Sequence, residues 1–261
     1  MELYDMYYLN SLVIVIVLFV LIVAADEVGL RIGGFYQRNT DEDLKSHTSA
    51  IQGGVIGMLA LILGFTFNMS IQRYDSRAGA EVAEANAIGT AELRAELLPD
   101  PYAGEAQAAI DDYIDLRVRS SHVDLTRRDE RRALTGETRA MQQRIWDIGI
   151  RAAEANPNPV KTGYFLTSVN DMIDAQGARL DVLERHVPPA IFYLLFLFFI
   201  ATGGLIGYSS GLGQRRSRVP ALILNLLICL LVFIIIDLDR PRRGLIQVKQ
   251  DSMEALVEVV D

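Results

Sequence analysis

The sequence predicts an all-α membrane protein, with four transmembrane helices and a cytoplasmic helical bundle inserted between spans two and three. The chain has 261 residues, of which 51% are hydrophobic and 22% charged, and its mean hydropathy is +0.22. Four long stretches carry almost no charge, so these averages mix membrane spans with a segment of ordinary soluble composition. The segment between stretches two and three is rich in Ala, Glu, Arg and Leu and lacks strand-type alternation.

The first span is predicted at about Met6 to Ala25. A cleaved signal peptide is the alternative, because Val23–Ala25 has the small residues of a cleavage site. The residues before the apolar run are acidic and aromatic, whereas a signal peptide begins with positive charge. A retained span is therefore favoured, with interfacial aromatic residues at Tyr4, Tyr7 and Tyr8.

Three further apolar runs are long enough for the roughly 30 Å of a bilayer core. The second span is predicted at about Ile51 to Gln72, the third from after Pro189 to Tyr208, and the fourth from after Pro220 to Ile236. Prolines are tolerated at a helix start, since the first N–H groups lack partners there. The second span also contains small residues that favour close helix contact, namely Gly53, Gly54, Gly57 and Gly64.

The segment from Arg73 to His186 is predicted to form helices separated by proline-rich breaks. The expected helices cover about 71–98, 102–125, 129–155 and 160–187, and no break separates the first from span two. Two of them carry packing stripes, one of alanines at 80, 83, 87, 91 and 95, and one formed by Val169, Ile173, Leu180, Leu183 and Val187. The predicted domains are 1–72 (spans one and two with their connecting loop, Asp26–Ser49), 73–187 (the helical domain), 188–239 (spans three and four) and 240–261 (a cytoplasmic tail).

Several function classes are excluded or disfavoured. The formal net charge of -8 offers no basic surface for nucleic acid. Cys229 is the single cysteine, so neither an intrachain disulfide nor a cysteine-based zinc site can form. No catalytic, cofactor or metal motif is present, so we expect no enzyme activity, no cofactor and no bound metal. The acidic pairs Asp111-Asp112 and Asp129-Glu130 are expected on solvated helix faces.

No Asp, Glu, Lys or Arg lies inside the four predicted spans, which argues against a proton-coupled pump. A passive pore with an apolar constriction and a protein that conducts nothing are both compatible with this. Four spans place the two termini and the helical domain on one side. A slight excess of Lys and Arg on that side favours cytoplasmic termini, whereas the basic cluster at 215–218 favours the reverse.

Three segments carry a family resemblance: Gly64–Arg77 (GFTFNMSIQRYDSR), Glu84–Pro99 and Asp237–Val248. They resemble the bestrophin-like bacterial membrane proteins, a family defined by a domain of unknown function, and the resemblance covers nearly the whole chain. The chain is also distantly similar to the bestrophin anion channels, through Gly64-Phe65 in span two and the surface motif of Arg73, Tyr74 and Arg77. The order of spans and soluble segments is the same.

The resemblance implies a homo-oligomer, pentameric as in bestrophins, in a bacterial inner membrane, with chloride or another inorganic anion passing an apolar neck lined by span two. Carried over by position, the pore-lining residues are Gly57, Leu61, Phe65 and Asn68. Gly57 has no side chain, which widens the neck at its level. The alternative is a non-conducting scaffold or sensor whose helical domain binds a partner.

A last motif combines acids and arginines around one proline: Asp237, Asp239, Arg240, Pro241, Arg242 and Arg243. One interpretation is an ordered tail contact with the first cytosolic helix, which the resemblance favours. The other is an electrostatic anchor to anionic lipid.

Overall fold

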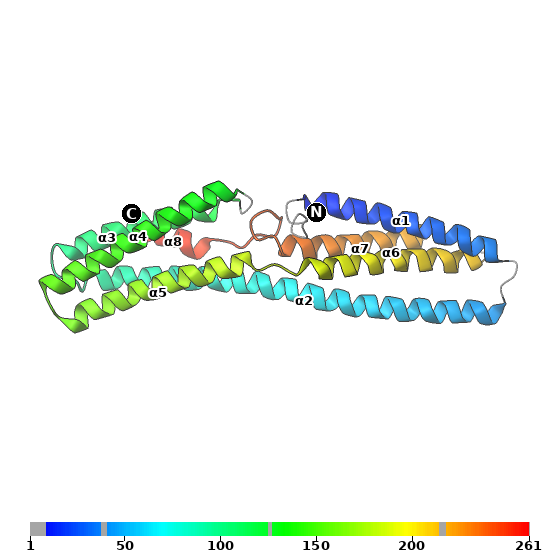
Figure 1. Ribbon diagram of the computed structural model, residues 1–261, viewed down its shortest axis with the longest axis horizontal. Helices are drawn as coiled ribbons and strands as arrows, with labels where there is room; N and C mark the ends of the chain where they lie inside the picture. The colour runs from blue at the N-terminus through cyan, green and yellow to red at the C-terminus, as the bar shows by residue number, and fades with distance from the viewer. Residues whose placement is uncertain (1–8, 38–40, 125–126, 214–217, 261) are drawn as a thin grey trace. The chain divides into compact units, whose positions relative to one another are not determined.

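The computed structural model describes residues 9–37, 41–124, 127–213 and 218–260, and the regular elements in these ranges are all α-helices (Figure 1). They are α1 (Ser11–Tyr36), α2 (Glu42–Ala95), α3 (Tyr102–Ser121), α4 (Arg128–Ala155), α5 (Pro159–Glu184), α6 (Pro189–Leu212), α7 (Arg218–Leu238) and α8 (Asp251–Val260).

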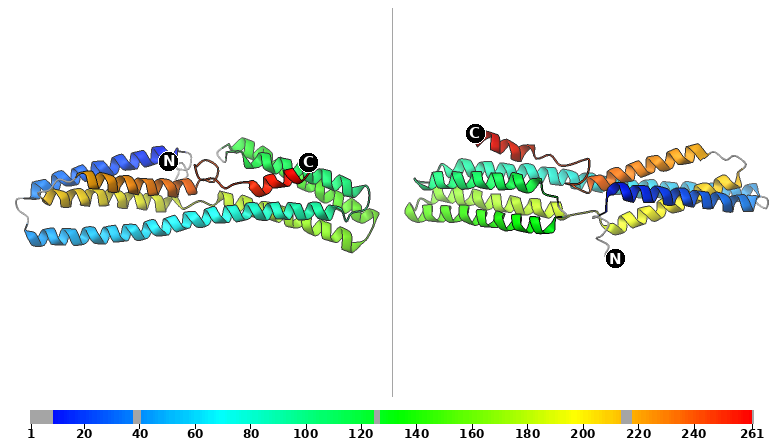
Figure 2. Two further views of the ribbon diagram at one scale, coloured as in Figure 1. Left: turned by 180° about the vertical axis from the view of Figure 1, so that it is seen from behind. Right: turned by 90° about the horizontal axis from the view of Figure 1, so that it is seen from above.

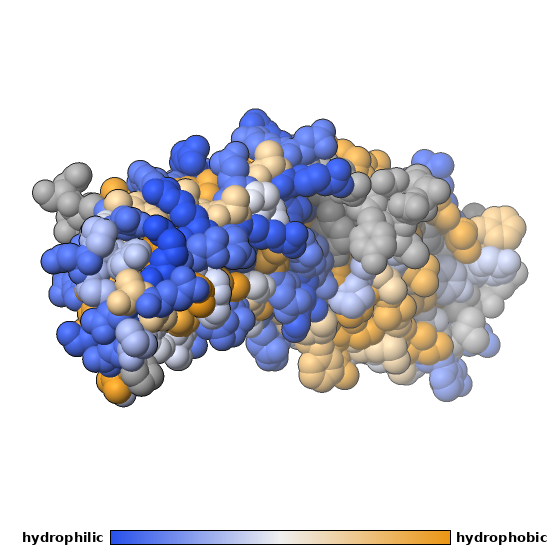
Figure 3. Space-filling model, turned by 60° about the vertical axis from the view of Figure 1, so that its left-hand side comes forward, coloured by the Kyte–Doolittle hydropathy of each residue, from blue (hydrophilic) through white to orange (hydrophobic). Residues whose placement is uncertain are grey.

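The chain divides into two compact units, which are described separately. The span unit comprises Met1–Gln72 and His186–Arg240, and the bundle unit comprises Arg73–Arg185 and Pro241–Asp261. The helix α2 contributes to both, because it continues without a break from Glu42 to Ala95. Among the residues that the structure describes, four helical stretches are long and apolar enough to cross a membrane; they include α1, the first part of α2, α6 and α7. In Figure 3 hydrophobic residues gather on one part of the surface and hydrophilic residues on another.

The boundaries of α1 differ from those of the predicted first span. Asn10 falls inside the predicted span of about Met6 to Ala25 but is the N-cap of α1, and its side chain accepts a hydrogen bond of 2.9 Å from the Leu12 N–H. The helix continues to Tyr36, so the connecting loop predicted over Asp26–Ser49 is wrong for most of its length. The expected interfacial tyrosines at 4, 7 and 8 lie outside the described residues.

Glycines bring α1 and α6 into contact at their backbones, and the two helices lie side by side in both Figure 1 and Figure 2. A Cβ added at Gly207 would lie 1.9 Å from the carbonyl oxygen of Asp26, and one added at Gly33 would lie 2.2 Å from that of Tyr208. Such approaches are available only to residues without a side chain. This contact explains why the polar end of α1 remains helical.

The glycines of α2 that are expected to make close helix contacts make none with the described residues of the chain. A Cβ built at Gly53, Gly54, Gly57 or Gly64 meets no atom within 4 Å. Among the described residues, the close approach uses the glycines of α1 and α6 instead, and close contact of the α2 glycines with another copy of the chain stays a prediction.

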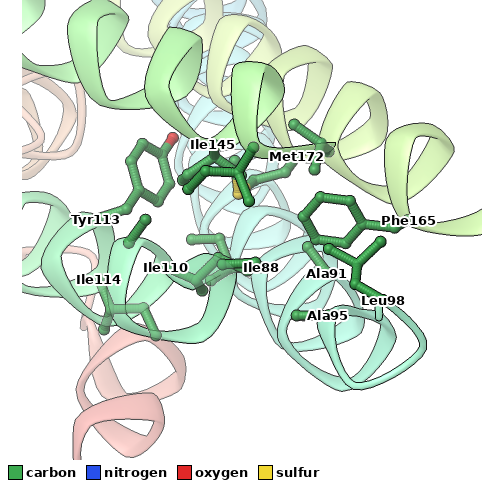
Figure 4. Close-up of a cluster of buried hydrophobic side chains, with 14 of the residues drawn as sticks. Ile88, Ala91, Ala95, Leu98, Ile110, Tyr113, Ile114, Ile145, Phe165 and Met172 are labelled. Atoms are coloured by element: carbon green, nitrogen blue, oxygen red, sulfur yellow. The ribbon is translucent and has the colours of Figure 1, made fainter. Parts of the chain in front are cut away.

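The core of the bundle unit is formed by side chains from α2, α3, α4 and α5 that point toward one another (Figure 4). Its fully buried members include Ile88, Ile110, Tyr113, Ile145 and Phe165. Cap geometry fixes one of these helices: the Asn158 side chain accepts hydrogen bonds from the N–H groups of Val160 and Lys161 at the start of α5.

The predicted alanine stripe of α2 is only partly correct. Ala91 and Ala95 are fully buried, but Ala83 is exposed. The buried face includes instead Glu81, Glu84-Ala85 and Ile88. The two glutamates accept hydrogen bonds inside the unit and therefore pack inward together with the small residues. On α5, Val169 and Leu183 are buried, whereas Val187 lies beyond the end of the helix.

The short helix α8 was not predicted from the sequence. Met253 is fully buried, and Leu256 and Val257 pack against the bundle core. The buried Glu81 carboxylate accepts a hydrogen bond of 2.9 Å from the Met253 N–H in the first turn of α8. An acid at a helix start satisfies a free N–H and interacts favourably with the helix dipole, so α2 fixes the start of the tail helix.

Candidate functional site

The four residues predicted to line a pore lie on an exposed face of α2. Leu61 is 58% and Phe65 62% exposed, and Gly57 and Asn68 are also exposed. The opposite side of the helix contacts the span unit, where Leu59, Thr66 and Ser70 are buried. The stripe is thus not covered by the described helices of its own chain.

The stripe carries no charge; Gly57, Leu61 and Phe65 are apolar, and Asn68 at its end is polar. Gly57, Leu61 and Phe65 follow one another at four-residue spacing, which places them on one helix face. The nearby Thr66 hydroxyl donates to the carbonyl oxygen of Ile62 at 2.8 Å and is buried away from the stripe. A surface of this kind can face lipid or the same surface of another copy, and it offers no group for proton transfer.

The surface motif Arg73, Tyr74 and Arg77 is not one site in the structure. Arg77 is 2% exposed, and its guanidinium donates to the carbonyl oxygens of Arg185 at 2.8 Å and Val182 at 3.3 Å. These carbonyls belong to the C-terminal end of α5, where a positive charge is favourable. Arg73 and Tyr74 are partly exposed on the same helix.

The tail motif divides between the two units. In the span unit, the buried Asp239 accepts a hydrogen bond of 3.0 Å from the Val187 N–H, Asp237 is also buried, and Arg240 donates to the Leu9 carbonyl. Asp239 thereby holds the chain just before α6 begins. Asp237 lies in the last turn of α7, and Asp239 and Arg240 follow the end of that helix at Leu238.

In the bundle unit, Pro241 is buried, and the two arginines that follow it contact the end of α3. Arg242 donates to the carbonyl oxygens of Ser120 at 2.9 Å and Val123 at 3.2 Å, and Arg243 lies 3.6 Å from the Asp124 carboxylate. The partners of these arginines are therefore the last turn of α3 and the residues just after it, whereas the sequence interpretation named the first cytosolic helix.

Sequence reasoning missed a buried charge cluster centred on Glu84. The carboxylate of Glu84, 0% exposed, accepts hydrogen bonds from Arg117 at 2.6 and 3.2 Å and from Arg179 at 2.6 Å. Arg179 also donates to the Gln250 side chain, which lies just before α8. The cluster joins α2, α3, α5 and the tail inside the bundle unit.

Electrostatics within this cluster favour the ionised state. Burial alone would raise the pKa of the Glu84 carboxyl, but the charges and hydrogen bonds of Arg117 and Arg179 outweigh burial and lower it. Burial likewise opposes the charge of Arg117, yet Glu84 raises the pKa of that guanidinium. Burial raises the pKa of the neighbouring Tyr113 hydroxyl to about 12. The cluster is a structural ion pair that keeps its charges at neutral pH.

The sequence held only a weak signal for this cluster. Glu84 stands in the Ala-rich run EVAEANAIGTAE, where an acid reads as part of a solvated face. Its partners are 33 and 95 residues away along the chain. Spacing therefore could not connect them.

Comparison with known proteins gives one family. The family model of the Bestrophin-like domain matches residues 13–253. This range covers all the described helices, apart from the start of α1 and the end of α8. No curated protein and no solved structure gave a significant match. With four apolar helices of membrane-spanning length and a family match over nearly its whole length, the chain belongs to the bestrophin-like family of membrane proteins.

Proposed function

We propose that this protein is a passive anion channel, a homo-oligomer in which the exposed stripe of α2 from each copy surrounds a central pore. The observation that carries the proposal is the combination of family membership with an α2 face that the described helices of its own chain leave uncovered. We further propose a bacterial inner-membrane location, with the bundle unit and both termini in the cytoplasm.

The side chains of the stripe support a narrow, apolar passage. A ring of Phe65 side chains from several copies would present aromatic edges, which carry partial positive charge and so favour anions. Leu61, one turn away, would add an apolar constriction that can empty of water and close. Gly57 would leave the passage wider at its own level.

The absence of charge along this stripe supports passive conduction. Coupled transport needs ionisable groups at membrane depth, and the stripe from Gly57 to Asn68 contains none. The anion would therefore move down its own electrochemical gradient.

Reconstitution in liposomes tests the proposal. We expect the purified chain to release trapped chloride, and Phe65→Ala to raise the rate and weaken the selectivity for anions over cations. The matched control is Leu197→Ala on α6, because Leu197 is 64% exposed and Phe65 is 62% exposed, but on another helix. The absence of flux, or equal effects of the two substitutions, would refute the pore.

A second candidate function is a membrane scaffold or sensor whose bundle unit binds a protein partner. The observation that favours it is a groove of about 740 Å³ between α3, α4 and α8, with apolar residues such as Leu116, Met141 and Val257 in its wall. Crosslinking from this groove to one specific protein, together with no chloride flux, would favour this function over the channel.

A further inference from the structure

A small cavity in the bundle unit is lined by three arginines. It measures about 50 Å³ and opens between α3, α4, α5 and the segment after Arg240. Arg117, Arg131 and Arg242 lie in its wall, and no Asp or Glu is among its described lining residues. Such an excess of positive charge around a partly enclosed space is unusual, because like charges repel strongly where water is scarce.

The carboxylates near the cavity do not balance its guanidinium groups. Glu84 is shared between Arg117 and Arg179, and Arg131 pairs with the exposed Glu184 at 3.0 Å. The hydrogen bonds of Arg242 within the described chain go to backbone carbonyls alone. Burial is the largest cause that lowers the pKa of Arg242 to about 10; the charges of Arg179, Arg117 and Arg131 lower it further, and Glu84 opposes the shift.

Several donors at the cavity have no acceptor within the described part of the chain. Arg242 donates through Nη1, so its Nε and Nη2 groups have no acceptor among the described residues. Arg117 donates to Glu84 through Nε and Nη2, so its Nη1 group has no acceptor there either. The Gln176 amide also lines the cavity and makes no hydrogen bond with the residues that the structure describes. Groups of this type gain free energy when an acceptor arrives.

We propose that this cavity binds a small tetrahedral oxyanion of the phosphate or sulfate type. One water molecule needs at least ~10–15 Å³ of such space, so a cavity of about 50 Å³ admits a group of a few heavy atoms. Guanidinium groups donate parallel N–H bonds to pairs of oxygens on one oxyanion, which a single chloride ion cannot accept in the same way. The site is separate from the α2 stripe and does not depend on conduction.

Binding to the site would tie the tail to the bundle. Arg242 belongs to the segment that leads to α8, whereas Arg117, Arg131 and Gln176 belong to α3, α4 and α5. An oxyanion held by all of them therefore crosslinks the four parts of the unit. This gives the protein a means to sense the concentration of such an anion through the order of its tail.

Calorimetric titration of the full-length chain in micelles of a neutral detergent tests the site. At constant ionic strength, we expect inorganic phosphate or sulfate to bind once per chain and to raise the melting temperature reported by Trp146, and chloride to do neither. Arg242→Gln should weaken phosphate binding by about tenfold or more, the effect of losing a charge-assisted hydrogen bond. Arg151→Gln is the control, since Arg151 lies on α4, is exposed, and pairs with Glu105 outside the cavity.

Because Arg242 also holds the end of α3, Gln176→Leu provides a second variant that keeps this contact. It should weaken phosphate binding and leave the melting temperature without phosphate unchanged. The proposal is overturned if the wild-type chain binds no phosphate or sulfate, if chloride binds equally well at the same ionic strength, or if the folded cavity variants bind as the wild type does.

Discussion

Replacing Glu84 by glutamine removes the carboxylate that Arg117 and Arg179 share inside the bundle unit. The chain contains a matched control. Glu105 accepts a hydrogen bond from Arg151 at 2.7 Å, close to the 2.6 Å between Glu84 and Arg117. The side chains of Arg151 and Glu105 are 52% and 41% exposed, whereas Glu84 is 0% exposed. The two substitutions, Glu84→Gln and Glu105→Gln, thus differ chiefly in burial, and also in that Glu84 has two partner arginines and Glu105 has one.

The expected magnitudes follow from that difference. Breaking a buried ion pair from one side costs about 3–5 kcal/mol, because the remaining charges stay buried without a counter-charge. An exposed pair contributes about 0–1 kcal/mol, since water screens it. With a urea dependence of about 2 kcal/mol per molar, Glu84→Gln should lower the unfolding midpoint by about 2 M. Glu105→Gln should lower it by less than about 0.5 M.

The fluorescence of Trp146 provides the assay. It is the single tryptophan of the chain and packs against the bundle core, so its emission reports the unfolding of this unit alone. Urea titrations of the full chain in neutral micelles would compare the two variants with the wild type. An equal loss of stability in the two variants, or a loss below about 1 kcal/mol for Glu84→Gln, would refute the stabilising role of the buried ion pair.

The stability of the same two variants should depend on pH in different ways. The pKa of Glu84 in the folded chain lies below its ordinary value of 4.5, because Arg117 and Arg179 outweigh the effect of burial. A lowered pKa contributes stability that is fully present above about pH 4.5 and is lost as the pH falls through the folded pKa. Acid should therefore destabilise the wild type more than Glu84→Gln, and Glu105→Gln should follow the wild type.

Two further predictions concern single positions. Gly207→Ala should destabilise the span unit by about 1–3 kcal/mol, because its Cβ would lie 1.9 Å from the Asp26 carbonyl oxygen. The control Gly64→Ala places its Cβ in open space and should leave the stability unchanged or increase it. Thermal unfolding in micelles measures both variants, and an equal loss of stability in the two would contradict the α1–α6 contact. Burial raises the pKa of Tyr113 to about 12. Because this tyrosine ionises at lower pH in the unfolded chain than in the folded one, the free energy of unfolding should fall by about 2 kcal/mol between pH 10 and 12. Tyr113→Phe should remove that loss in alkaline urea titrations, and an unchanged alkaline loss would exclude Tyr113 as its source.

Helix type and order follow directly from the local sequence. The apolar runs, the prolines at 99 and 101, and Asn158-Pro159 place the helices, because these signals act over a few residues. The length of α1 was harder to predict, since Asp26 and Glu27 indicate the end of an apolar run. The helix continues because Gly29 and Gly33 pack on α6, a contact between positions far apart in the chain.

The predicted pore stripe and the buried clusters also differ in how far the local sequence could locate them. The stripe from Gly57 to Phe65 could be drawn from helical spacing alone, and its exposure in the single chain depends on tertiary packing. The Glu84 cluster and the arginine cavity could not be found from spacing, because Arg117, Arg179 and Arg242 come together only when the bundle closes. The tail helix was missed because α8 has only 10 residues, although Met253, Leu256 and Val257 have helical spacing.

Particle imaging of the purified chain in a lipid nanodisc can show whether the copies assemble around α2. We expect a closed ring of identical copies, with α2 of each copy nearest the axis and the Phe65 side chains facing it. A monomeric particle, or a ring in which the stripe from Gly57 to Asn68 faces lipid, would contradict it.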